Sequence, residues 1–319
     1  MRSKTKLVST LVLLSLICLT LFGCGGEKND WRSLYDSTGK YLSNQESPTV
    51  GSVGGEWAVI GLARSERLND AAAKAYLQNA ENHVQSAGND RLNSVKSTEN
   101  SRLILGITAA GGDPTDIGDH NLLNGLADMD YIKKQGNNGP IWALLAFDCG
   151  DYAIPENSGL TRDKIVDFIL SQQCSDGGWG FIGDSSDIDM TAMALQSLAP
   201  YRDKDNVHTA VEKALNYLSE RQTAEGGYES YGAQNCESSA QVIVALCSLG
   251  IDPETDERFV KEGRTVIEAL CGFAVGDGMF CHQKDKPQGD RMATEQAYYA
   301  LTAYERFTSG KSALYDMSR

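Results

Sequence analysis

Residues 161–198 read TRDKIVDFILSQQCSDGGWGFIGDSSDIDMTAMALQSL, and this stretch decides the fold that we predict. It begins with an amphipathic helix that ends near Gln173 and continues into a glycine-rich turn over 176–180. Glycine permits the positive φ angles that a tight reversal needs. The next helix, from about Asp187 to Leu198, is apolar on nearly all sides, which is typical of a buried helix. The stretch therefore predicts an outer helix that leads into an inner helix.

The same unit recurs along the chain. An aromatic residue follows the turn glycines at Trp179, Tyr228 and Phe280, a spacing of about 50 residues that indicates a repeat architecture. No single copy can bury its inner helix alone, so neighbouring copies must close around it. The pattern predicts outer helices over 30–44, 70–87, 119–130, 161–173, 213–222 and 270–273, and inner helices over 56–65, 98–110, 138–148, 187–198, 237–249 and 291–307.

These twelve helices predict an all-α fold, an (α/α)6 toroid of six outer–inner helix pairs. No linker or low-complexity segment interrupts the pattern, so we predict one toroid domain over residues 30–308 and a C-terminal tail over 309–319.

The N-terminus carries the features of an export signal. A basic start is followed by an apolar run over 7–22, which is short for a membrane span, and Leu21-Phe22-Gly23-Cys24 resembles a bacterial lipobox. We predict a lipoprotein signal peptide over 1–23, lipidation at Cys24 and a lipidated tether over 24–29, which would anchor the protein outside the cytoplasmic membrane of a bacterial cell. A plain signal peptide with a chance cysteine is the alternative.

The charge of the chain excludes one class of partner. The full chain has a formal net charge of −14, and removal of Arg2, Lys4 and Lys6 with the signal peptide lowers it to −17. Such a surface repels nucleic acid, so we predict no nucleic-acid partner. We expect a monomer.

The remaining cysteines show neither a CxxC pair nor the spacing of a metal site, and we predict no metal and no cofactor. We favour free buried thiols, with a Cys247–Cys271 or a Cys236–Cys281 disulfide as the alternative. The six residues concerned are Cys149, Cys174, Cys236, Cys247, Cys271 and Cys281.

Two of the repeats resemble the QW repeat of terpene cyclases. The matching residues are Phe168-Ile169, Gln173 and Gly177-Gly178-Trp179 in one copy, and Lys213-Ala214, Tyr217-Leu218, Gln222 and Gly226-Gly227-Tyr228 in the next. The chain thus resembles the prenyltransferase/squalene-cyclase repeat superfamily, and the segments 54–65, 97–99 and 136–142 are similar to its bacterial cell-surface proteins. The resemblance implies the α/α toroid. It leaves the activity open, because the superfamily includes cyclases, protein prenyltransferases and cobalamin carriers.

Acidic residues recur at the predicted starts of inner helices. In a closed toroid all inner helices run the same way, so we expect these acids to ring one mouth. They either cap the helices by accepting hydrogen bonds from free N–H groups, or they carry function. The acids are Glu56, Glu99, Asp187 with Asp189, Glu237 and Glu295.

One of these acids lies in a motif. Asp187-Ile188-Asp189-Met190-Thr191-Ala192 resembles the DxDDTA motif of class II terpene cyclases. Asp189 takes the place of the aspartic acid that protonates an alkene or epoxide in that family, whereas Met190 replaces the last aspartate. Asp189 and Glu237 on neighbouring inner helices are also candidates for the paired carboxylates of a glycosidase. Asp187, Asp189 and Glu237 are therefore the candidate catalytic residues.

The sequence favours a membrane-anchored binding protein over an enzyme. We expect a small or medium-sized amphipathic ligand, with a corrinoid as one candidate, at the mouth formed by the inner-helix N-termini. A cyclase-like isomerase, a glycan-cleaving hydrolase and a toroid that binds another surface protein without a small ligand are the alternatives. The candidate ligand-binding residues are Glu56, Trp57, Glu99, Trp142, Tyr231 and Glu295.

Overall fold

The computed structural model describes residues 30–45, 48–230 and 232–318. The signal peptide, Cys24, the tether and Tyr231 therefore lie outside the described residues. Inner helices occur where the sequence predicts them: α3 (Glu56–Arg64), α5 (Ser97–Ala109), α8 (Asn138–Asp148), α10 (Ile188–Leu198), α12 (Cys236–Ser248) and α14 (Arg291–Thr308). The outer helices are α2 (Trp31–Ser43), α4 (Asp70–Ala87), α6 (Leu122–Leu126) with α7 (Met129–Ile132), α9 (Arg162–Ser171), α11 (Asp205–Arg221) and α13 (Val266–Cys271).

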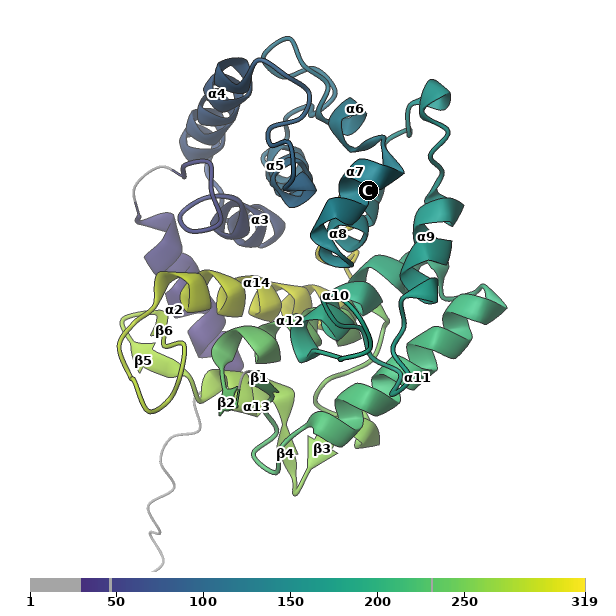
Figure 1. Cartoon of the computed structure of the whole chain (residues 1–319). Coiled ribbons are helices and arrows are strands. Elements are labelled where there is room, and N and C mark those ends of the chain that lie inside the picture. The colour runs from purple at the N-terminus through teal and green to yellow at the C-terminus, as the bar shows by residue number, and fades with distance from the viewer. Residues whose placement is uncertain (1–29, 46–47, 231, 319) are drawn as a thin grey trace, which may run out of the picture.

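The inner helices form a closed ring. They pack against one another in the order α3, α5, α8, α10, α12 and α14, and α14 returns to pack against α3. Each outer helix packs on an inner helix, and α2 contacts both α14 and α3, so the two ends of the chain close the ring. Figure 1 shows α4, α9 and α11 at the periphery and α5, α8 and α12 inside them. The predicted all-α toroid of six outer–inner pairs is confirmed.

Burial distinguishes the two layers as the sequence predicts. In α8 every residue from Gly139 to Phe147 is buried, whereas α9 buries only Ile165, Val166 and Ile169. The described strands are short hairpins in the loops and pair antiparallel: β1 (Glu229–Ser230) with β2 (Ala233–Gln234), β3 (Val260–Lys261) with β4 (Arg264–Thr265), and β5 (Ala274–Gly276) with β6 (Met279–Phe280).

Three outer helices differ from the prediction. Helix α13 begins at Val266 rather than at the predicted residue 270, because Thr265 and Glu268 form a capping box at its start. The helix predicted over 119–130 is broken into α6 and α7, because the Asp128 side chain accepts hydrogen bonds from the backbone N–H groups of Asp130 and Tyr131 and starts a new helix there. Helix α11 begins at Asp205, earlier than the predicted 213–222. Its first turns are polar in sequence, but Val207 and Val211 are buried and hold these turns against the core.

The turns between paired helices depend on the QW-like residues. Gly177 has φ +91°, as the sequence predicts for this turn. The Gln173 side-chain amide donates to the carbonyls of Gly177 and Ala210, both at 2.8 Å, which joins the turn to the next outer helix. The Trp179 indole is fully buried and donates to the Ile169 carbonyl at 2.7 Å. These contacts fix the end of α9 relative to the start of α10.

The C-terminal segment packs against the C-terminal ends of the inner helices. Leu314 and Tyr315 are buried, and the Met317 N–H donates to the Cys149 carbonyl at 2.8 Å. The Arg64 guanidinium donates to the carbonyls of Ala313 and Asp316. The segment 312–318 consequently lies at the C-terminal end of α8, and Figure 1 marks the end of the chain near this helix. The residues predicted as a tail thus close one end of the toroid.

All six cysteines of the described ranges are buried and free, which is the arrangement that the sequence favours. Among the described helices, none has both the length and the apolar character needed to cross a bilayer.

Candidate functional site

A cavity of about 470 Å³ opens where the N-terminal ends of the inner helices converge. Its wall takes residues from the first two turns of all six inner helices, together with side chains from the loops that precede α12 and α14. We call it the mouth cavity. The residues that line it are Trp57, Thr98, Arg102, Asn138, Trp142, Asp189, Met193, Ser230, Asn235, Glu237, Gln241, His282, Met292 and Gln296.

Asp189 is the unusual acid of this cavity. Its Oδ1 atom is buried and has no hydrogen-bond partner among the described residues. Burial is the main cause that raises the pKa of Asp189 to about 6; the charges of Asp187 and Glu237 add to the rise, and the Ser238 hydroxyl opposes it. A carboxyl group with such a pKa is protonated more often near neutral pH than an ordinary aspartic acid, and its protonated form can transfer the proton to a bound molecule.

Asp187 has a different environment, although it is only two residues away. It is the N-cap of α10, and its Oδ1 accepts a hydrogen bond from the Met190 N–H at 3.0 Å. Its Oδ2 accepts from the Ser230 hydroxyl at 3.4 Å. The capping alternative therefore describes Asp187, whereas Asp189 lies in the first turn and faces the cavity.

Glu237 faces the same cavity from α12 and is paired. Its Oε2 lies 2.7 Å from Nδ1 of His282, whose side chain is half exposed. Burial raises the pKa of Glu237, and the hydrogen bond to His282 opposes this rise. Asn235, rather than Glu237, caps α12 by accepting from the Ser238 N–H. The cavity thus contains an acid, Asp189, whose Oδ1 has no partner among the described residues, and a carboxylate–imidazole pair formed by Glu237 and His282.

Aromatic side chains form the inner wall of the cavity. The rings of Trp57 and Trp142 lie 5.2 Å apart, and Tyr299 contacts Trp57 at 6.0 Å between ring centroids. Both candidate ligand-binding tryptophans, Trp57 and Trp142, line the cavity. Gln241 donates to the hydroxyl of Tyr299, which fixes the ring from behind.

Besides Asp187, three of the predicted acids do not line the cavity. Glu56 is fully buried and binds Arg102 at 2.8 Å, the Tyr76 hydroxyl and the N–H of Gly51. Glu295 is also fully buried, and it accepts from the Gly54 N–H at 2.9 Å and from Arg291 at 3.0 Å.

The partners of Glu56 and Glu295 explain why these acids do not line the cavity. Both carboxylates hold the loop before α3, and burial raises the pKa of each. Glu99 is half buried but does not line the cavity either. A position near the start of an inner helix correctly identified Asp189 and Glu237 as cavity residues. The other acids lie at positions on their helices that face away from the cavity.

Two residues of the cavity were not selected from the sequence. Arg102 lies one turn into α5 and belongs to the site only because Glu56 holds its Nε. His282 lies in the loop after β6, and its pairing with Glu237 joins positions 45 residues apart. No sequence pattern marks either residue. Within the described residues, no cluster of His, Cys, Asp and Glu has the arrangement of a metal site.

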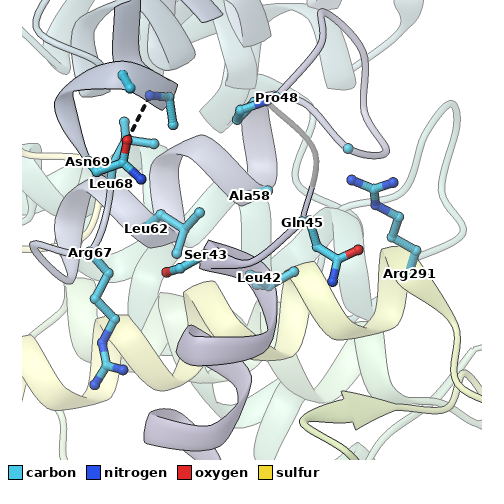
Figure 2. A pocket seen from close by; sticks show the side chains of 13 residues that line it. Leu42, Ser43, Gln45, Pro48, Ala58, Leu62, Arg67, Leu68, Asn69 and Arg291 are labelled. Carbon is cyan, nitrogen blue, oxygen red and sulfur yellow. Dashed lines mark hydrogen bonds between the residues drawn. The ribbon is translucent and has the colours of Figure 1, made fainter. Parts of the chain in front are cut away.

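A second, smaller pocket of about 250 Å³ lies between α2, α3 and α4 (Figure 2). Its centre is apolar, with Leu42, Ala58 and Leu62, and the guanidinium groups of Arg67 and Arg291 lie on opposite sides of it. Each guanidinium already binds a carboxylate, Arg67 that of Asp36 and Arg291 that of Glu295. The described side chains therefore offer this pocket no free charge for chemistry.

Comparisons with known proteins point to cyclases. No family model matches the chain. Over 161 residues, which are 50% of the chain and 30% of the relative, it is 25% identical to the drimenyl diphosphate synthase of Streptomyces showdoensis. Over 75 residues it is 39% identical to the drimenyl diphosphate synthase of Streptantibioticus cattleyicolor, of which it covers 13%. The chain thus spans less than a third of the length of these curated relatives.

Solved structures share the fold. An ent-copalyl diphosphate synthase from Streptomyces platensis matches 78% of this chain and 49% of its own, with a TM-score of 0.51 and 16% identity. The type II terpene cyclase MstE from Scytonema, solved with its product merosterolic acid A, matches 88% of this chain and 98% of its own, with a TM-score of 0.56 and 12% identity. An unsaturated glucuronyl hydrolase from a Bacillus species matches 91% and 100%, with a TM-score of 0.60 and 12% identity.

These findings confirm the resemblance to the terpenoid cyclase and prenyltransferase toroids, and they correct the predicted function. The ligand-binding function favoured by the sequence is wrong, because both curated sequence relatives are diphosphate synthases. Met190 stands where the cyclase motif has its last aspartate, and this substitution was wrongly interpreted as a sign that catalytic activity is lost. The enzymes that the chain resembles in sequence and in fold include terpene cyclases, as expected for a terpene cyclase-like protein.

Proposed function

We propose that the chain is a cyclase-like isomerase that starts the cyclisation of a linear polyprene by protonating a carbon–carbon double bond, with Asp189 as the acid. The observation that carries this proposal is the buried Oδ1 of Asp189, without a partner among the described residues, on a side chain that lines the mouth cavity and has a pKa of about 6. Only the protonated form of a carboxyl group can transfer a proton, and the raised pKa of Asp189 increases the share of that form over that of an ordinary aspartic acid.

The reaction balances without a co-reactant. The O–H bond of Asp189 breaks and a C–H bond forms at one alkene carbon, which leaves a carbocation at the other. A second double bond of the same chain attacks this cation and closes a ring, and loss of a proton from a neighbouring carbon forms the final alkene. The product is therefore an isomer of the substrate, and the proton returns to a base.

The wall of the cavity suits such a cation. Trp57 and Trp142 line the cavity, and a cation positioned over the face of either ring would gain about 0.5–2 kcal/mol. The cavity lies within the range of about 300–1,000 Å³ that is usual for small-molecule sites. The names of the sequence relatives, drimenyl diphosphate synthases, favour a prenyl diphosphate as the substrate class.

The test uses the chain from residue 25 onwards, incubated with linear polyprenes and polyprenyl diphosphates of increasing length, with product detection by mass spectrometry and chromatography. Asp189→Asn should reduce turnover by at least ~10²-fold while the protein stays folded, because the amide has no proton to transfer. Asp163→Asn, which changes an exposed acid of the outer helix α9, is the matched control and should leave turnover unchanged.

The pH dependence gives a second readout. The wild-type rate should fall about tenfold per pH unit above about 6, because only the protonated form of Asp189 is active. A wild-type protein that converts none of these substrates, or an Asp189→Asn variant with full activity, refutes the proposal.

A glycan-cleaving hydrolase is the second candidate, and one observation favours it. Asp189 and Glu237 line the same cavity, and the charge of Glu237 raises the pKa of Asp189, as in a carboxylate pair that shares acid and base roles. Incubation of the same variants with oligosaccharides separates the two candidates. Loss of a reducing-end product in both Asp189→Asn and Glu237→Gln would favour the hydrolase.

We also propose that Cys24 anchors the protein outside the cytoplasmic membrane. The support is the sequence Leu21-Phe22-Gly23-Cys24 after the apolar run over 7–22. Cys24→Ser should abolish labelling with radioactive fatty acid and partition into the detergent phase. A substituted protein that still labels and partitions refutes the anchor.

A further inference from the structure

A larger cavity lies at the opposite end of the toroid from the mouth. It has a volume of about 810 Å³ and is formed by the C-terminal ends of α8, α10 and α12 together with the segment 312–318. We call it the rear cavity. Its lining residues include Asp148, Arg162, Gln196, Tyr201, Ser248 and Tyr315. None of them lines the mouth cavity.

Two buried polar atoms of this wall have no partner among the described residues. The first is Oε1 of Gln196, whose side-chain amide donates to the backbone carbonyl and to Oε1 of Gln241, both at 3.0 Å. The second is the hydroxyl of Tyr315. Gln196 is 2% exposed and Tyr315 is 5% exposed. A buried polar group without a partner costs about 1–3 kcal/mol, so a fold that keeps two of them beside one cavity calls for an occupant.

The polar groups around these atoms are already satisfied. Asp148 accepts from Arg162 at 2.6 Å and from the Tyr201 hydroxyl at 2.8 Å, and Arg162 also donates to the carbonyls of Phe147 and Tyr152. The Ser248 hydroxyl donates to the carbonyl one turn earlier in α12. This network orders one side of the wall, and Gln196 and Tyr315 are the lining residues with a buried polar atom that lacks a partner among the described residues.

The charged residues of the lining limit the charge of the guest. The acidic residues of the lining are Asp148, Asp151, Asp203 and Asp316. Arg162 and Arg202 belong to the same lining, and Arg64 and Arg306 bind the segment 312–318 from behind. The lining itself therefore holds four carboxylates and two guanidinium groups, and this excess of acid disfavours an anionic guest. A neutral guest with hydroxyl groups can donate to carboxylate oxygens and so is compatible with this wall.

The two atoms without a partner among the described residues indicate the chemical class of the guest molecule. Oε1 of Gln196 can only accept a hydrogen bond, and the Tyr315 hydroxyl is available as a donor. An alcohol group donates and accepts at once and so suits both atoms. We propose that the rear cavity is a second binding site, separate from the mouth cavity, for a neutral polyhydroxylated molecule such as a sugar or a cyclic polyol.

The experiment measures the binding of three probes, glucose, cellobiose and myo-inositol, to the chain from residue 25 onwards by saturation-transfer NMR and calorimetry. We expect at least one probe to bind. Tyr315→Phe should weaken its binding by about 2–10-fold, the effect of one hydrogen bond, without loss of thermal stability, because the hydroxyl has no partner in the described chain. Ser248→Phe, which fills the cavity with a ring and leaves both unpartnered atoms in place, should abolish binding.

Asp189→Asn is the control at the other end of the toroid and should leave probe binding unchanged. If it abolishes binding, the sugar binds in the mouth cavity and the proposal is wrong. Absence of binding by all three probes also overturns it. So does a crystal structure at saturating probe in which only water contacts Gln196 and Tyr315. If Ser248→Phe does not fold, Tyr315→Phe still tests the proposal. This variant lacks the hydroxyl donor, so an unchanged affinity for the probe would show that the donor does not bind it and would overturn the proposal.

Discussion

Replacement of Asp189 by asparagine should make the protein more stable at neutral pH. The carboxyl group is buried in the first turn of α10, and Oδ1 has no partner among the described residues. Burial raises the pKa of Asp189 from 3.8 to about 6, so the folded protein disfavours the charged form. Each unit of pKa corresponds to 1.36 kcal/mol, and the shift therefore represents a cost of about 3 kcal/mol for ionised Asp189 at pH 7.

The sign of the pH dependence follows from proton linkage. Between pH values of about 4 and 6 the folded protein keeps a proton on Asp189 that the unfolded chain releases, so the free energy of unfolding falls as the pH rises through this window. Above a pH of about 6 both states are ionised, and the cost stays constant. Asp189→Asn removes the charge, so it should abolish this part of the decline and raise stability at pH 7 by about 1–3 kcal/mol. The lower value of this range applies if the residues around Asp189 rearrange and reduce the cost of its charge in the wild type.

Urea unfolding of the wild type and the variant at pH values from 4 to 8 checks this expectation. Asp187→Asn is the matched control, because the amide oxygen can still accept from the Met190 N–H and stability should change by less than ~0.5 kcal/mol. A variant at position 189 that is less stable than the wild type at pH 7 would falsify the reading of Asp189 as a strained acid. Greater stability together with lost turnover is the pattern expected of an active-site group.

Two further predictions concern packing. Trp179→Ala should reduce stability by about 3–5 kcal/mol in urea unfolding, because the indole is fully buried and donates to the Ile169 carbonyl; a cost near zero contradicts its place between the repeats. Arg64→Ala should expose the segment 312–318, since Arg64 donates to the carbonyls of Ala313 and Asp316. Hydrogen exchange at the Met317 amide should then accelerate by at least ~10-fold, and unchanged protection would show that Leu314 and Tyr315 hold the segment by themselves.

The sequence alone determined the repeat and therefore the fold. Helical periodicity separates one-sided helices such as α9 from helices such as α8 that are apolar all round, and a one-sided helix has only one way to bury its stripe. The turn glycines and the aromatic residues after them mark each reversal, so the order of outer and inner helices could be predicted. These signals are local, and they depend on residues within about one helix of each other. The break between α6 and α7 was missed because one capping side chain, Asp128, outweighs a continuous apolar pattern.

Only the tertiary structure decided which acids share a cavity. Asp189 and Glu237 were selected together with Glu56, Glu99 and Glu295 because all lie near the starts of inner helices, and a sequence does not give the rotation of each helix about its axis. Packing around the ring fixes that rotation. It directs Asp189 and Glu237 to the lumen and buries Glu56 and Glu295 against the loop before α3. The pairing of Glu237 with His282 and the contact of Tyr315 with Trp142 likewise join positions far apart in the chain, where periodicity carries no information.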